Sequence, residues 1–179
     1  MIGEFSVKVK SSNKKATVAF VISLAISVVI FAISFIIDKY SGLVGNLGLI
    51  SLVVAVLFYT KYIAPVYYYD IMCDSDGEAV LVVRMMNGKR QTTLCRIGLA
   101  EIIKMESESA SERRAHKTET GVRVYSYSPT LMPDKTYRLY TRSRYERAEI
   151  ILEISDELAA LLARYVSEAR EKALNADDE

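Results

Sequence analysis

Histidine and cysteine are scarce in this chain. Its 179 residues include one histidine, His116, and two cysteines, Cys73 and Cys95. These residues lack the spacing of metal ligands, and no C-x-x-C is present, so we expect neither a metal nor another cofactor. A general base must be held within hydrogen-bond reach of its partner. His116 lies in a charged stretch, and we therefore expect it to be a solvated loop residue.

Sequence motifs of catalysis are also missing. The chain has no glycine-rich phosphate loop and no G-x-S-x-G nucleophile motif. Asp74-x-Asp76-Gly77 matches only half of a calcium loop, because the later glutamate is absent, and a tight turn explains these residues. An enzyme acting on lipid or peptidoglycan precursors has no supporting residue. We expect a protein that is not an enzyme.

Charge is absent from two long segments near the N-terminus. Between Lys15 and Asp38 lie 22 uncharged residues, and between Lys39 and Lys61 lie 21. A helix of that length spans about 30 Å, the hydrocarbon thickness of a bilayer. The first segment is too long for a signal peptide and has no suitable cleavage site. A small domain cannot cover two such helices on every face, which argues against core helices.

The sequence therefore predicts a transmembrane hairpin over residues 16–64, with helices at about 16–37 and 43–59. Small residues recur along both helices and are expected to face each other, because lipid gives no hydrophobic drive for association. Neither span has a charged residue in its interior, which argues against a polar pathway through the membrane. The two stripes are Ala19, Ser23 and Ser27 on the first helix, and Gly48, Ser51 and Ala55 on the second.

Basic residues give the expected orientation. Lys8, Lys10, Lys14 and Lys15 precede the first span, and basic residues favour the cytoplasmic side. We expect a multi-pass protein of the cell membrane with both termini in the cytoplasm. Residues 1–15 are then a short cytoplasmic arm, and the two cysteines lie in a reducing compartment as free thiols.

Residues 65–174 change to an alternating pattern that is typical of strands. Asn87-Gly88 predicts a hairpin with a type I′ turn, and the charged stretch 107–120 predicts a long exposed loop. Ser155 is a candidate cap of a final helix that ends near Ala173, and residues 175–179 form an acidic tail that we expect to be disordered. Seven strands are expected, at 67–73, 78–86, 89–97, after Gly98, 122–127, 136–141 and 148–154.

Seven strands followed by one amphipathic helix resemble the pleckstrin-homology-like (PH-like) fold. Together with two membrane spans, this order resembles bacterial PH-like membrane proteins of the YcxB-like group. The similarity covers roughly residues 15–172, and its most specific segments are Arg96–Met105 and Tyr137–Tyr140. Leu99 stands where that family usually carries an aromatic residue. The resemblance implies a membrane α-hairpin plus a mainly β domain, a seven-stranded sheet or barrel capped by the C-terminal helix. It also implies a recognition or scaffolding module.

Basic clusters are the remaining candidates for a binding site. Anionic lipids attract such residues by about 1 kcal/mol each near a membrane surface. Acidic residues are interleaved with them, however, and residues 61–179 carry 18 of the 23 Lys and Arg and 20 of the 22 Asp and Glu. An ordinary solvated surface is therefore an alternative, and nucleic-acid binding is not expected. The candidate contacts to a headgroup or partner are Lys89, Arg90, Arg113, Arg114, Lys117, Arg142, Arg144 and Arg147.

Two functions follow from this sequence. The first is a non-enzymatic protein whose membrane-anchored PH-like domain binds a protein partner or lipid headgroups at the cytoplasmic face. The second is a subunit or regulator of an oligomeric transport or channel assembly, with self-association through the small-residue faces of the hairpin.

Overall fold

The computed structural model describes residues 5–9, 13–37, 41–143 and 147–177. The chain divides into two compact units. One unit is Ser11–Pro65, and the other combines Met1–Lys10 with Val66–Glu179. Each unit has its own internal packing and is described separately.

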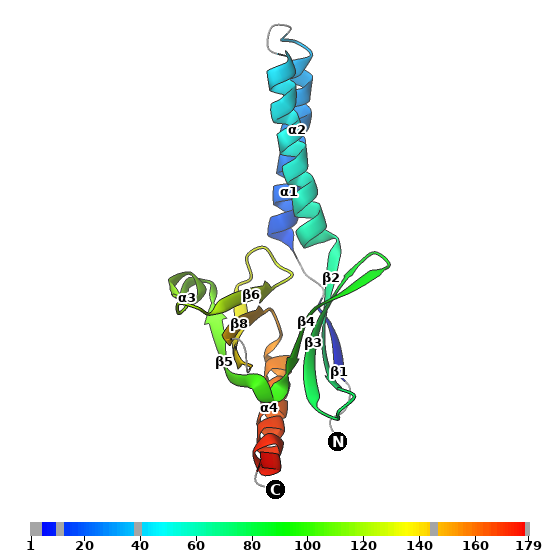
Figure 1. The fold of residues 1–179 in the computed structure, drawn as a ribbon. Coiled ribbons are helices and arrows are strands. Elements are labelled where there is room, and N and C mark those ends of the chain that lie inside the picture. The colour runs from blue at the N-terminus through cyan, green and yellow to red at the C-terminus, as the bar shows by residue number, and fades with distance from the viewer. Residues whose placement is uncertain (1–4, 10–12, 38–40, 144–146, 178–179) are drawn as a thin grey trace. The chain divides into compact units, whose positions relative to one another are not determined.

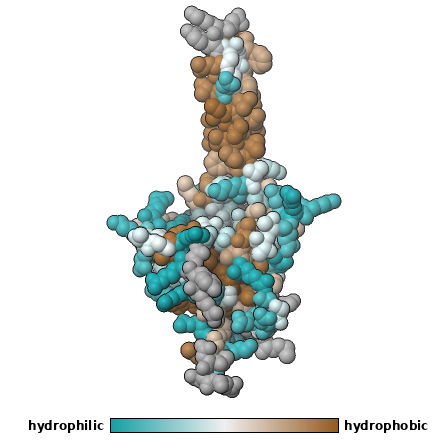
Figure 2. All heavy atoms as spheres, in the orientation of Figure 1, coloured by the Kyte–Doolittle hydropathy of each residue, from teal (hydrophilic) through white to brown (hydrophobic). Residues whose placement is uncertain are grey.

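The first unit is a hairpin of two helices that lie side by side (Figure 1). They are α1 (Lys14–Ser34) and α2 (Ser41–Phe58), and a π-helical turn (Tyr59–Ile63) extends α2. Both helices are long and apolar enough to cross a membrane, and only 11% of each candidate span is buried. Hydrophobic side chains cover most of the visible surface of this hairpin (Figure 2). Outside a membrane, such a surface would be in contact with water.

The contact between α1 and α2 uses the predicted small residues. The Ser27 hydroxyl donates a hydrogen bond to the Gly48 carbonyl at 2.9 Å, and the Ser51 hydroxyl donates one to the Ser23 carbonyl at 2.9 Å. Ala55 is 1% exposed. The prediction that the two stripes face each other is confirmed for these residues, and both hydroxyls are satisfied within the hairpin.

The first sheet of the second unit has the order β1-β2-β3-β4. Its strands are β1 (Phe5–Val9), β2 (Pro65–Cys73), β3 (Ala79–Asn87) and β4 (Arg90–Gly98). Strand β1 is not among the strands that the sequence predicts, because residues 1–15 are expected to form a cytoplasmic arm. Phe5–Val9 instead pairs antiparallel with β2, and its alternating sequence places Val7 and Val9 against the core.

The turn between β3 and β4 is displaced by one residue from the prediction. Asn87 pairs with Arg90, so Gly88 and Lys89 are the central residues of the turn. Gly88 has a φ of +60°, and no described residue other than glycine has a positive φ. These values match a II′ turn, which needs glycine at its first central position, and they exclude the expected type I′ turn.

The second sheet has the order β5-β7-β8-β6. Its strands are β5 (Ile102–Ser109), β6 (Arg123–Tyr127), β7 (Lys135–Arg142) and β8 (Arg147–Leu152). Strand β6 pairs parallel with β8, whereas β7 pairs antiparallel with β5 and β8. The expected long loop at 107–120 is wrong in its first part. Strand β5 continues to Ser109, and helix α3 (Ala110–Ala115) follows it.

One hydrophobic core joins both sheets to helix α4 (Asp156–Asp177). The Ser155 hydroxyl accepts a hydrogen bond from the Leu158 amide at 3.2 Å, which confirms the predicted cap. The helix continues to Asp177, beyond the predicted end at Ala173. Its predicted apolar stripe is confirmed, since each member belongs to or packs against the core: Leu158, Leu161, Leu162, Tyr165, Val166 and Ala169.

Two sheets of four strands with a C-terminal helix, and two apolar helices, are thus the observed architecture. Seven strands in a sheet or barrel were expected, and the described residues form eight strands in two sheets of four. The extra strand comes from the N-terminal segment, which has the alternation of a strand but precedes the apolar helices in the sequence.

Candidate functional site

The outer face of the second sheet carries polar side chains. Register places Lys104 opposite Tyr140, Glu106 opposite Arg138, and Tyr140 opposite Glu149. Directly opposite residues point to the same face of a sheet. The intervening residues, such as Leu139 and Ile150, point into the core. Alternation therefore gathers charged groups from β5, β7 and β8 on one surface.

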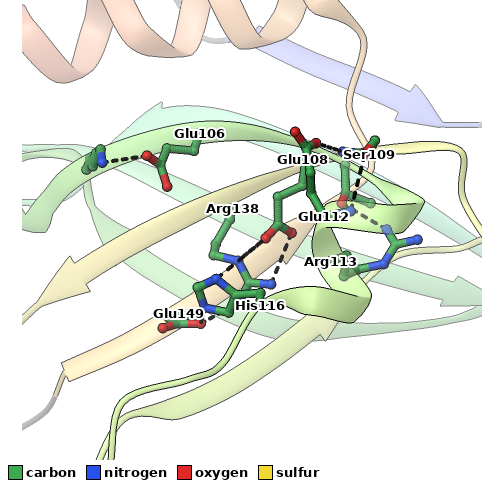
Figure 3. A network of polar contacts seen from close by, with 10 residues as sticks. Glu106, Glu108, Ser109, Glu112, Arg113, His116, Arg138 and Glu149 are labelled. Carbon is green, nitrogen blue, oxygen red and sulfur yellow. Dashed lines mark hydrogen bonds and ion pairs between the residues drawn. The ribbon is translucent and has the colours of Figure 1, made fainter.

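Arg138 is the centre of a buried network on this face (Figure 3). Its guanidinium donates to the Glu108 carboxylate at 2.7 and 3.0 Å and also to Glu149. The three residues are only 2–6% exposed. Burial opposes the charge on Arg138, but the hydrogen bonds to Glu108 and Glu149 outweigh burial and raise the pKa of its guanidinium. In this cluster one permanent cation, Arg138, therefore bridges the carboxylates of Glu108 and Glu149.

His116 completes this network. Its Nε2 atom lies 3.1 Å from Glu149 Oε2, and its Nδ1 atom lies 4.0 Å from Glu108 Oε1. The imidazole side chain is 24% exposed. The expectation of a solvated loop histidine is therefore wrong, because the segment after α3 folds back over the polar face of the sheet.

Helix α3 holds this cover in place. Ser109 and Glu112 form a capping box, with each side chain accepting a hydrogen bond from the backbone amide of the other residue. Arg113 donates from its guanidinium to the Thr136 hydroxyl at 2.9 Å and to the Pro133 carbonyl at 2.8 Å. These bonds fasten a short helix that has little stability of its own.

A cavity of about 450 Å³ lies beside the network. One wall is the segment after α3, and the others come from β5, β7 and β8. The lining residues are Ile103, Lys104, His116, Lys117, Glu119, Val122, Tyr140, Thr141, Arg142, Arg147, Ala148 and Glu149.

Three cations around this cavity have no acidic partner among the described residues. Arg142 and Arg147 lie directly opposite each other across β7 and β8, and Lys117 lies on the covering segment. All three are exposed, and none forms an ion pair with a carboxylate in the part of the chain that the structure describes. Like charges opposite each other destabilise a sheet. An anion bound between them would relieve that repulsion.

The remaining basic residue of the cavity is already neutralised. Lys104 Nζ lies 2.5 Å from Glu106 Oε1. The hydrogen bonds from Lys104 and from Tyr140 lower the pKa of Glu106. Burial, together with the hydrogen bond to Glu106, raises the pKa of the Tyr140 phenol to about 12. Tyr140 is therefore a neutral group at physiological pH, and a ligand must find its countercharge at Lys117, Arg142 and Arg147.

The basic residues that were predicted to contact a headgroup or partner lie in different parts of the structure. Lys117, Arg142 and Arg147 line one cavity. Lys89 and Arg90 are at the β3–β4 turn of the other sheet, and Arg113 and Arg114 are on α3 outside the cavity lining. Arg144 lies outside the described residues.

Sequence reasoning did not find the buried partners. Glu108 and Arg138 are 30 residues apart, and nothing local in the sequence relates them. A local signal did exist for α3, since Ser109-x-x-Glu112 is the S-x-x-E pattern of a capping box. Reading it would have predicted a helix within the charged stretch, and hence a cover for the sheet.

Comparison of the chain with family models, curated proteins and solved structures finds no match. The cavity and the hairpin are therefore the features from which a function can be inferred.

Proposed function

We propose that this chain is a non-enzymatic membrane-anchored recognition protein, whose β domain binds anionic lipid headgroups at the cytoplasmic face. In this proposal α1 and α2 cross the cell membrane, and their exposed apolar side chains contact lipid. The β domain is a PH-like domain of the YcxB-like group. The order of strands ending in a helix that closes the core supports this relationship.

The observation that carries the proposal is the opposed pair Arg142 and Arg147, with Lys117 nearby on the same cavity. Guanidinium groups are planar donors that match the oxygens of phosphate. A like-charged pair that has no carboxylate partner within residues 41–143 and 147–177 lowers the stability of the domain. Departures of this kind from good packing are expected at functional sites.

The buried network supports a structural role for its carboxylates. Glu108 and Glu149 are both engaged by Arg138, whereas a general base has to be free to take a proton from a substrate. The network instead fixes the strands and the covering segment that shape the cavity.

The segments that connect the β domain to the hairpin are short. A short tether increases the occupancy of a weak headgroup site. Strand β1 ends at Val9 and α1 begins at Lys14, and β2 begins at Pro65, two residues after the π-helical turn ends. A tethered domain meets nearby headgroups at an effective concentration in the millimolar range. Modest affinity is then sufficient for occupancy.

The experiment compares the full chain in nanodiscs of phosphatidylcholine with nanodiscs containing phosphatidylglycerol. Hydrogen exchange of residues 116–122 and 141–148 should slow in the anionic discs. The double variant Arg142→Gln/Arg147→Gln should lose that protection, whereas the matched variant Lys89→Gln/Arg90→Gln, on the other sheet, should keep it. Equal exchange in both lipids would overturn headgroup binding and leave a protein partner as the function to test.

The second candidate function is an oligomeric transport or channel assembly, and Asn46 is the residue that supports it. Its side chain is exposed on α2, and an amide in lipid forms hydrogen bonds with a neighbouring span. The small-residue faces themselves are already used between α1 and α2. Crosslinking in membranes should therefore give oligomers that Asn46→Leu abolishes, and a strictly monomeric chain would overturn this candidate.

A further inference from the structure

The hairpin of β3 and β4 continues beyond the core as a two-stranded arm, residues 84–93, which we call the β3–β4 arm. Strand β3 is buried up to Val83 and becomes half-buried or exposed from Arg84 onward, and Arg90–Thr93 of β4 are all exposed. Figure 1 shows this hairpin ending in a loop that projects from the β domain. The register shifts between Val83 and Arg84, and a bulge of this kind bends a strand and redirects it.

The β3–β4 arm is basic. Residues 79–100 contain four Lys or Arg and no Asp or Glu. Two of the four are paired with Asp70 and Asp74. The other two, Lys89 and Arg90 at the tip, form no ion pair with a carboxylate in the ranges of the chain that the structure describes. The tip therefore presents two positive charges that the β domain does not neutralise.

Two methionines lie just below these charges. Met85 and Met86 are successive strand residues, so they point to opposite faces of the arm. Both are half-buried, and their cross-strand neighbours are the uncharged Thr92 and Gln91. Methionine is flexible and packs against irregular apolar surroundings. Basic side chains next to apolar ones suit the surface of an anionic membrane, because their charged ends reach phosphates while their stems lie against apolar groups.

The tip is at the end of the sheet that is joined to the second candidate span. The Asp74 amide donates to the Glu78 carbonyl at 2.7 Å in the tight turn between β2 and β3, so these neighbouring strands run antiparallel. Each has nine residues, which places the end of β3 beside Pro65 at the start of β2. Pro65 follows the π-helical turn by two residues, and two residues of chain reach at most about 7 Å. A chain anchored through α2 therefore keeps this end of the sheet near the headgroups.

We infer that the β3–β4 arm is a second membrane contact, in which Lys89 and Arg90 bind the phosphates of anionic lipids and Met85 and Met86 enter the layer below the headgroups. This contact rests on the proposed membrane anchoring of the chain, but it uses none of the residues of the cavity. Two contacts on different sheets restrict the rotation of the β domain about its tether.

The test places a fluorescent label on the arm of the full chain in nanodiscs. Gln91→Cys carries bimane in a chain in which Cys73 and Cys95 are replaced by serine. The matched site is Asp76→Cys, in the exposed turn at the opposite end of the same sheet. The discs contain phosphatidylcholine alone or with phosphatidylglycerol. Each also contains a lipid with a nitroxide quencher, either on the headgroup or high on the acyl chain.

We expect the label at Gln91→Cys to be quenched only in the discs with phosphatidylglycerol, and the label at Asp76→Cys to be quenched in neither. Each basic residue near an anionic surface strengthens the contact about fivefold, so Lys89→Gln/Arg90→Gln should weaken it about 30-fold. Met85→Thr/Met86→Thr keeps the charges. It should preserve quenching from the headgroup and lose most of the quenching from the acyl chain.

Three results would contradict the inference. Equal quenching in both kinds of disc, or quenching that Lys89→Gln/Arg90→Gln retains, overturns a contact made by these cations. Acyl-chain quenching that is unchanged in Met85→Thr/Met86→Thr overturns the entry of the methionines. Absence of quenching at Gln91→Cys in both discs overturns the membrane contact and leaves an acidic protein surface as the partner of the arm. Melting curves that match the parent chain establish that the variants are folded.

The same discs separate this contact from the headgroup site of the cavity. Arg142→Gln/Arg147→Gln should keep the quenching at Gln91→Cys. Lys89→Gln/Arg90→Gln should keep the slow hydrogen exchange of residues 116–122, because the tether holds the domain at the membrane without the arm. Quenching without slowed exchange in the parent chain overturns the cavity as a headgroup site and supports the arm, whereas slowed exchange without quenching overturns the arm alone.

Discussion

Arg142 and Arg147 face each other across β7 and β8 at the edge of one cavity. Two guanidinium groups in directly opposite positions repel each other, which costs about 0.2–1 kcal/mol in a sheet. Neither side chain forms an ion pair with a carboxylate among the described residues. This repulsion therefore lowers the stability of the domain when no anion is bound.

Arg147→Gln should stabilise the domain in the absence of anions. Removing a repulsion of about 0.2–1 kcal/mol raises the melting temperature by about 0.4–4 °C, given about 2–4 °C per kcal/mol for a chain of this size. The same variant should lose the stabilisation that sulfate gives the parent chain. Thermal unfolding with and without sulfate measures both effects. Arg114→Gln, an exposed arginine on α3 outside the cavity, is the control and should change neither.

Arg138→Met should be strongly destabilising. It leaves Glu108 and Glu149 buried without their cation, and breaking a buried ion pair costs about 3–5 kcal/mol. The triple variant with Glu108→Gln and Glu149→Gln removes the stranded charges and should recover most of that loss. Chemical unfolding followed by circular dichroism measures the difference.

The matched control for Arg138→Met is Arg164→Met. Arg164 forms an exposed i,i+4 pair with Glu168 at 3.4 Å, and such pairs contribute only about 0.3–0.5 kcal/mol. A comparable loss in both variants would show that Arg138 stabilises the sheet no more than a surface residue does.

Gly48→Val should disturb the hairpin, whereas Gly45→Val should not. A Cβ atom at Gly48 would lie 3.2 Å from the Phe31 ring and 3.3 Å from Ile30, but one at Gly45 meets nothing within 4 Å. Both changes put the same residue into α2, so the intrinsic helix propensity cancels. The readout is the rate of disulfide formation between Ser23→Cys and Ser51→Cys in a chain lacking Cys73 and Cys95. Gly48→Val should slow it, and equal rates in the two variants would contradict close packing at Gly48.

Patterns repeated within one element predicted most of the fold. The uncharged runs gave α1 and α2, alternation gave seven strands near their observed places, and Ser155 with its apolar stripe gave α4. The small-residue stripes even predicted the contact between the two helices. Each of these signals depends on spacing along the chain, which one sequence displays directly.

Relationships between distant elements were not predictable in the same way. The pairing of β1 with β2 crosses the whole hairpin, and β6 pairs parallel with β8. The candidate site was likewise predictable only in part. Lys117, Arg142 and Arg147 were singled out as charged residues, but only the fold shows that they share one cavity while Arg113 binds Thr136 instead.

The burial of charged residues was also not predictable from their spacing in the sequence. Glu108 and His116 belong to a stretch that has the composition of a solvated loop. Glu108 becomes buried and His116 half-buried because β5 continues through that stretch and α3 then folds over the sheet. Charge in a sequence indicates solvent exposure only when no partner of opposite charge is brought close by the fold.

Cys73 should react with maleimide several-fold faster than Cys95 at pH 7, because it is the more accessible thiol. Cys73 is exposed at the end of β2, whereas Cys95 is partly buried in β4, and burial raises the pKa of the Cys95 thiol. The thiolate is the reactive form, so a raised pKa slows the reaction at pH 7. Labelling of Cys73→Ser and Cys95→Ser variants measures the two rates, and the Cys95 rate should rise steeply toward pH 9. Equal rates at pH 7 would contradict the burial of Cys95.

The same cysteine tests the proposed orientation in the membrane. Cys73 lies in the β domain, ten residues beyond the π-helical turn that ends at Ile63, so it stays on the side of the membrane where the second span ends. With a cytoplasmic domain, a membrane-impermeant maleimide should leave Cys73 unlabelled in intact cells and label it after permeabilisation. The Cys95→Ser background removes the slower thiol, and Ser41→Cys in a chain without Cys73 and Cys95 marks the opposite side, beside the short loop between the spans. Labelling of Cys73 in intact cells, with Ser41→Cys protected, would reverse the orientation. The β domain would then be outside the cell, where the anionic cytoplasmic leaflet is out of reach of Arg142 and Arg147.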